Sequence, residues 1–290
     1  MRFLIILLAF VFIPSVNAQE IQKVSFPNDI ANIPDEIKDL QWNRWTSKNF
    51  TVLAIDDNQA KYLNQNLESI KSWSIQRWGL QDFDFSKECK VVVVNNPELF
   101  SKMFKMNNTS VEIRDDVSVV FILANGSPSS TIPVPISEIC FNEFAARQKT
   151  DFNWASYRGM SLLNGSLDQI KRSIIDLKKP LDNNDPIYFS ESLFATTKKE
   201  YFALDQRKMN LYDQSALVTM LLIRKEYGQT KLHKFLQMSS TSGAEKAIKE
   251  VLGFRDYDQF DATLKRYMLD LTSDVQKGVT PNHYLQINTK

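Results

Sequence analysis

Apolar residues in the first half of the chain gather in short runs with the character of strands. β-Branched and apolar residues crowd residues 50–55 and 117–123, and residues 90–94 contain four consecutive valines. Such runs, bounded by polar residues, predict strands, and a run as apolar as the valine stretch is typical of a strand buried on both faces. Between the runs at residues 50–55 and 90–94, apolar positions at helical spacing predict a helix over residues 60–78 that ends at Gly79.

Beyond about residue 135 the apolar positions follow helical spacing instead. Ser137 is placed to cap the first helix of this region. Further helices are predicted over residues 154–163, 166–177, 212–227, 231–238, 244–252 and 257–271. Residues 216–223 are apolar nearly all round, which predicts a helix buried at the centre of this half.

The order of these elements predicts an α+β protein. A small N-terminal lobe with a mixed β-sheet, residues 19–135, precedes an all-helical lobe, residues 136–273, and a polar tail over residues 274–290. A chain of 290 residues, of which 43% are hydrophobic, is long and apolar enough to bury a substantial core.

The first eighteen residues have the pattern of a secretory signal peptide. Arg2 precedes an apolar run over residues 3–13, and Pro14 and a small-residue site ending at Ala18 follow. The run is shorter than the roughly 20 residues that a membrane-spanning helix needs. We therefore expect cleavage after Ala18 and a secreted or periplasmic protein without a membrane span; an uncleaved anchor is the alternative.

Charge and glycine content argue against two classes of partner. Lysine and arginine number 35 against 34 acidic residues, and cleavage would remove Arg2, so the mature chain is balanced and shows no sign of binding nucleic acid. The eight glycines form no spaced cluster that would cradle a phosphate, and we expect no cofactor.

The chain has two cysteines, Cys89 and Cys140. In an oxidising compartment, an isolated pair favours a disulfide, and this one would close a loop worth about 4 kcal/mol in the chain-entropy model. The alternative is a nucleophilic thiolate at Cys140, stabilised by the start of a helix. It would need a base, and His233 and His283 are the only histidines.

Residues 142–161 carry the most specific pattern in the chain. After the predicted strand 117–123 and a loop, residues 142–146 read Asn-Glu-Phe-Ala-Ala, and residues 154–161 read Trp-Ala-Ser-Tyr-Arg-Gly-Met-Ser. This arrangement resembles the peptidase-MA-like gluzincins, zinc peptidases with a thermolysin-like fold. Their first helix carries His-Glu-x-x-His, and a later helix supplies a glutamate as the third zinc ligand. The likeness runs in order over residues 42–271, and no single motif is complete.

The resemblance places other residue types at all three metal-ligand positions. Asn142 and Ala146 stand where the histidines would be, Arg158 stands where the ligand glutamate would be, and only Glu143 is retained. A catalytic zinc needs three donor side chains; alanine offers none, asparagine is a poor one, and a guanidinium repels a dication. The sequence therefore predicts no bound metal and no catalytic residue, that is, an inactive homologue of the peptidases.

Three arrangements of Glu143 remain open. The resemblance implies that Arg158 faces Glu143 across the former metal cavity, so the favoured hypothesis is an ion pair in which Arg158 replaces the lost cation. Arg147 lies four residues after Glu143, and this spacing commonly gives a helix-surface ion pair. The third arrangement is an exposed glutamate.

The sequence thus predicts an exported, non-catalytic pseudopeptidase with a binding or structural role. An extended peptide or protein in the groove between the lobes, paired with an edge strand, is the expected partner. One alternative is a metal-independent hydrolase that uses Glu143 and a second carboxylate about 5–10 Å away. The other is an architectural component of an envelope or virion, with a large exposed apolar patch and no cleft.

Overall fold

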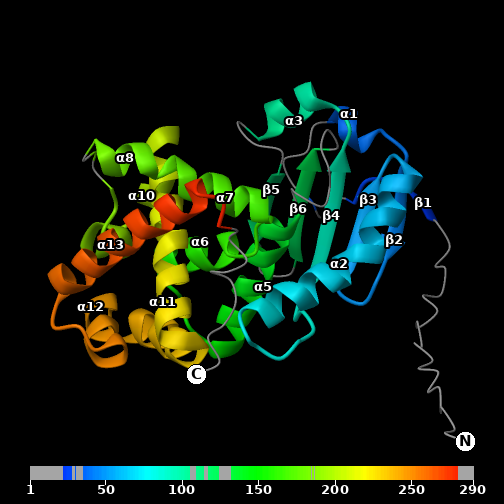
Figure 1. Ribbon diagram of the computed structural model, residues 1–290. Coiled ribbons are helices and arrows are strands. Elements are labelled where there is room, and N and C mark those ends of the chain that lie inside the picture. The colour runs from blue at the N-terminus through cyan, green and yellow to red at the C-terminus, as the bar shows by residue number, and fades with distance from the viewer. Residues whose placement is uncertain are drawn as a thin grey trace, which may run out of the picture.

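The computed structural model describes residues 22–27, 30, 35–104, 109–113, 117–123, 132–183, 185 and 187–279. In Figure 1 a sheet with its covering helices lies beside a larger group of helices. This is the predicted α+β organisation, with the sheet in the N-terminal part and helices after it. The expected signal peptide, residues 1–18, lies outside the described residues, as does most of the expected polar tail.

The described strands form one mixed sheet in the order β1-β2-β3-β4-β6-β5. The strands are β1 (Gln22–Val24), β2 (Trp42–Thr46), β3 (Phe50–Ala54), β4 (Glu88–Val94), β5 (Thr109–Ile113) and β6 (Val117–Leu123). β3, β4 and β6 pair in parallel, whereas β1, β2 and β5 join by antiparallel pairing. β6 is buried along its whole length and β4 from Cys89 onward, as their apolar runs predict for strands covered on both faces.

The sheet is accompanied by α1 (Asp35–Lys38), α2 (Asp57–Arg77) and α3 (Pro97–Met103). The helical lobe contains α5 (Pro133–Gln148), α6 (Trp154–Leu162), α7 (Leu167–Asp176), α8 (Lys178–Asp182), α9 (Ser190–Ala195), α10 (Lys198–Phe202), α11 (Gln206–Thr241), α12 (Ala244–Ala247), the π-helix η1 (Ile248–Leu252) and α13 (Tyr257–Gln276). Among the described residues, no helix combines the length and apolar character needed to cross a membrane.

Local capping explains several helix boundaries. Asp56 accepts hydrogen bonds from the backbone N–H groups of Asn58 and Gln59, and α2 begins there. α5 begins at Pro133, earlier than predicted, because proline lacks the N–H that a first helical turn leaves unpaired. Ser137 is therefore inside α5, where its buried hydroxyl accepts a hydrogen bond from Asn164 Nδ2 at 2.8 Å.

α11 joins the two helices predicted over residues 212–227 and 231–238. The chain passes between them through Gly228, whose φ of 78° and ψ of 170° interrupt the helix. A positive φ is favourable only for glycine, so this residue fixes the position of the kink. Residues 216–223 are all buried, which confirms a central buried helix.

Buried hydrogen bonds connect the two lobes. The indole N–H of Trp78, at the end of α2, donates to the carbonyl of Met160 on α6 at 3.1 Å. Asn164 Nδ2 donates to the carbonyl of Ser74 on α2 at 3.2 Å. One apolar cluster also continues from the sheet through α5 to α11, so the sheet and the helices share a core.

Candidate functional site

Glu143 is buried and holds a loop of the sheet lobe. Its carboxylate oxygen Oε2 accepts hydrogen bonds from the backbone N–H of Ser86 at 2.8 Å and from the Ser86 hydroxyl at 2.7 Å. The residue is only 2% exposed. All three arrangements predicted for Glu143 are therefore wrong, because its partner comes from the segment before β4.

Arg147 is attached to the same segment. Its guanidinium donates to the backbone carbonyl of Asp84 and lies 4.8 Å from the ring centre of Phe83. Arg147 and Glu143 thus each hold the loop before β4 and do not pair with each other. Tertiary contacts replace the local ion pair that their spacing favours.

Arg158 lies in a cluster of polar side chains from four helices, α5, α6, α10 and α11. Its Nε and Nη2 donate to the two carboxylate oxygens of Asp213 on α11 at 2.9 and 2.7 Å, and Nη1 donates to Glu138 on α5 at 2.5 Å. The hydroxyl of Tyr201 donates to Asp213 at 3.1 Å. We call Glu138, Arg158, Tyr201 and Asp213 the Arg158 cluster.

Burial and charge shape the ionisation of this cluster. Burial raises the pKa of Glu138 above its usual range, although the charge of Arg158 acts in the opposite direction. Burial alone would lower the pKa of Arg158, but the charges of Asp213 and Glu138 raise it well above its usual value. Arg158 therefore stays charged and cross-links α5, α6 and α11, with two carboxylates as its partners.

The donor set around the motif does not fit a zinc ion. Ala146 is exposed and has no donor atom, and Asn142 supplies only an amide. Arg158 brings a permanent positive charge and already occupies the nearby carboxylates of Glu138 and Asp213. Among the residues that the structure describes, no three histidine, cysteine, aspartate or glutamate side chains are placed to hold a metal.

The predicted disulfide is wrong. Cys89 on β4 and Cys140 on α5 are free, fully buried thiols in the core shared by the sheet and the helices. Burial raises the pKa of both thiols, so they stay protonated and pack as small apolar side chains. A nucleophilic Cys140 is wrong for the same reason, and His233 is bonded elsewhere, to the carbonyl of Trp78 at 2.7 Å.

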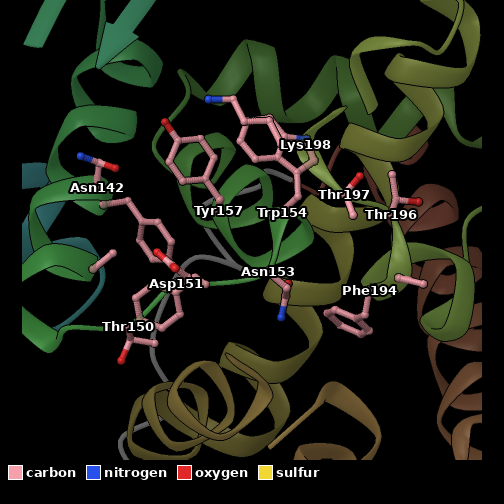
Figure 2. Close-up of a pocket in the computed structure, with 14 residues that line it drawn as sticks. Asn142, Thr150, Asp151, Asn153, Trp154, Tyr157, Phe194, Thr196, Thr197 and Lys198 are labelled. Atoms are coloured by element: carbon pink, nitrogen blue, oxygen red, sulfur yellow. The ribbon is translucent and has the colours of Figure 1, made fainter. Parts of the chain in front are cut away.

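A cavity of about 630 Å³ lies beside the C-terminal half of α5. In Figure 2, Asn142 stands on one side, Phe194 and Thr196 stand on the other, and Trp154 and Tyr157 of α6 lie between them. This volume falls in the range of small-ligand sites. We call this space the α5 cavity.

The α5 cavity combines aromatic surfaces with polar groups. Trp154 and Tyr157 stack with their ring centres 4.8 Å apart and an interplanar angle of 13°. The ammonium group of Lys198 lies 5.6 Å from the Trp154 ring centre. Threonine and asparagine side chains and the carboxylate of Asp151 complete the lining. Such a site suits a ligand with flat or apolar groups and a polar backbone.

The structure separates the residues that the motif would bring together. Asn142 lines the α5 cavity, whereas Ala146, Glu143 and Arg158 do not. Sequence reasoning missed the carboxylates that bind Arg158, although the position of Glu138 one turn before Asn142 was available as a signal. No known family model matches the chain, and no curated protein matches it either.

Proposed function

We propose that this chain is an exported, non-catalytic pseudopeptidase with a gluzincin-like scaffold that binds an extended peptide at the α5 cavity. The observation that carries the proposal is the Arg158 cluster beside an open cavity. The arginine at the position of a metal ligand is fixed by two carboxylates, while the neighbouring cavity keeps room for a ligand. The proposal rests on two supports: the resemblance of residues 142–161 to the gluzincins, and the geometry of the Arg158 cluster and the α5 cavity.

The surroundings of Glu143 support a role without catalysis. A general base must come within hydrogen-bonding distance of the proton that it removes. Glu143 is 2% exposed, does not line the α5 cavity, and is bonded to Ser86. A metal-independent hydrolase based on Glu143 is therefore disfavoured.

The position of β5 supports a peptide as the ligand. β5 lies at one end of the strand order, pairs with β6 on one side, and contacts α5. A peptide that added to its other edge would gain main-chain hydrogen bonds without any metal. α5, which β5 contacts, also supplies Phe141, Asn142 and Ala145 to the wall of the cavity, so the sheet edge and the cavity share this helix. The cavity also weighs against the architectural alternative, which predicts no cleft.

A pair of neighbouring substitutions tests this proposal. Ala145→Trp would fill the α5 cavity, which Ala145 lines, whereas Ala146→Trp adds the same side chain at an exposed position outside it. The mature protein and both variants would be immobilised and exposed to peptides from digested casein, and bound peptides would be identified by mass spectrometry. We expect intact peptides on the wild type and on Ala146→Trp, and few on Ala145→Trp.

Two results would count against the proposal. Equal retention by Ala145→Trp and the wild type would remove the cavity as the binding site. Cleavage of the bound peptides by the wild type would contradict the absence of catalysis. Circular dichroism of each variant would confirm that the fold is intact.

A further inference from the structure

Two arginines lie at the junction of α2 and α11, apart from the Arg158 cluster. Arg77 is in the last turn of α2, and Arg224 is one turn before the kink at Gly228. Arg224 is 3% exposed, and Arg77 is half-buried. Within the described ranges, neither guanidinium forms a salt bridge with a carboxylate.

Arg224 presents unused hydrogen-bond donors in a buried place. Its Nε and Nη1 have no hydrogen-bond partner among the described residues. A buried charged group without partners is costly, so most buried arginines are paired with carboxylates. Arg224 is an exception, because two of its buried donors remain available to a bound group.

Arg77 adds a second positive charge at the same junction. Its guanidinium lies over the ring of Trp73, 4.7 Å from the ring centre, which orients it. Burial, together with the positive charge of Arg224, lowers the pKa of Arg77 to about 10. Burial also lowers the pKa of Arg224. The charge of Arg224 thus disfavours the charged form of Arg77, and an anion bound at the junction would offset this effect.

The junction around the two arginines is closely packed. The end of the Gln229 side chain lies where a Cβ on Gly79 would stand, and the φ of 70° at Gly79 is itself a conformation that favours glycine. The Nε2 group of Gln229 is another buried donor without a partner among the described residues. His233 Nε2 donates to the carbonyl of Trp78 and ties α11 to the end of α2. The His233 bond fixes the end of α2, next to Arg77, against α11 before any ligand arrives.

We propose that Arg77 and Arg224 form a binding site for a small dianionic oxyanion, such as phosphate or the phosphate group of an ester. Two guanidiniums require two negative charges for neutralisation, and a single carboxylate supplies only one. The planar guanidinium matches phosphate oxygens by paired hydrogen bonds. Because Arg224 is buried and Arg77 is more exposed, the anion would enter past Arg77.

Calorimetric titration of the full mature chain tests the site. Sodium phosphate, sodium sulfate and sodium acetate would be added at pH 7.5, with sodium chloride keeping the ionic strength equal. We expect phosphate and sulfate to bind and to raise the melting temperature, and acetate to do neither. Arg224→Met should weaken phosphate binding about tenfold to a hundredfold, the value of one or two charged hydrogen bonds.

Matched variants make the result decisive. Arg77→Met should also weaken phosphate binding, whereas Arg255→Met, at an exposed arginine paired with Asp256, should leave it unchanged. Glycerol phosphate distinguishes a phosphate ester from free phosphate as the ligand. If glycerol phosphate binds as tightly as inorganic phosphate, the site accepts an esterified group; if only inorganic phosphate binds, the ligand is the free ion. Equal phosphate affinity in the wild type and Arg224→Met, or no phosphate binding by the wild type, would overturn the proposal.

Discussion

Arg158 and Arg224 are both largely withdrawn from water, yet their surroundings differ. Arg158 bonds to two carboxylates, one of them through both of its oxygens. Arg224 is more deeply buried and, among the described residues, has no carboxylate partner. The first arginine completes its interactions inside the fold and acts as a cross-link. The second leaves its interactions incomplete, and this difference separates a structural arginine from a recognition site.

The largest expected effect is the loss of the Arg158 cross-link. Arg158→Met would leave Glu138 and Asp213 without their shared cation, and we expect the free energy of unfolding to fall by about 3 kcal/mol. Urea denaturation measures this change. Arg255→Met, at an exposed pair, should stay within about 0.5 kcal/mol of the wild type. A loss below about 1 kcal/mol in Arg158→Met would show that the cluster contributes little.

The two carboxylates of the Arg158 cluster, Asp213 and Glu138, should contribute unequally to the free energy of unfolding. Asp213 accepts two hydrogen bonds from Arg158 and one from Tyr201, whereas Glu138 accepts one from Arg158. Burial also favours the neutral form of Glu138, since it raises the pKa of that residue. We expect Asp213→Asn to cost about 2 kcal/mol and Glu138→Gln about 1 kcal/mol or less in urea denaturation. The reverse order would contradict this description of the cluster.

Replacing Arg224 should change the free energy of unfolding in the opposite direction to replacing Arg158. In a buffer without phosphate or sulfate, Arg224→Met removes an uncompensated buried cation and keeps an apolar side chain of similar length. We expect the free energy of unfolding to rise by about 1 kcal/mol. Thermal and urea unfolding both measure the change. A clear loss of stability would indicate that Arg224, like Arg158, is satisfied within the fold.

The smallest expected effect is a pH dependence of stability that arises from His233, which bonds to Trp78 at the junction of α2 and α11. Burial lowers the pKa of His233 below 6.5, although its hydrogen bond to Trp78 acts in the opposite direction. The unfolded chain therefore takes up a proton first, and stability falls as the pH falls from about 6.5 to the lower pKa of the folded state. His233→Gln removes this titration. The stability of the wild type relative to His233→Gln should fall between pH 7.5 and 5, and a constant difference would contradict the prediction.

The central parts of the fold could be predicted because their apolar patterns are long. The strands over residues 50–55, 90–94 and 117–123 and the buried helix over residues 216–223 agree with the structure. β2 was missed because its sequence, Trp-Asn-Arg-Trp-Thr, contains polar residues and is recruited by pairing with β3. α8, α9 and α10 were missed because helices of five or six residues are too short to show a period.

The candidate site was harder to predict because it depends on how α5 is rotated. Glu138 and Glu143 are five residues apart, so they project from α5 about 140° apart. One reaches Arg158, and the other reaches Ser86. The sequence did not specify which glutamate would face the neighbouring helices. The disulfide prediction was wrong for a related reason. An oxidising compartment and a single pair of cysteines favour a disulfide, but they do not reveal that both thiols are core residues.

The hydrogen bonds from Trp78 to Met160 and from Asn164 to Ser74 have a consequence for engineering. They are buried, and each joins α2 of the sheet lobe to the α6 region of the helical lobe. Cutting the chain near residue 135 would expose unpaired donors and acceptors on both fragments. We therefore expect the chain to melt in a single calorimetric transition, with neither lobe able to be produced as a stable fragment.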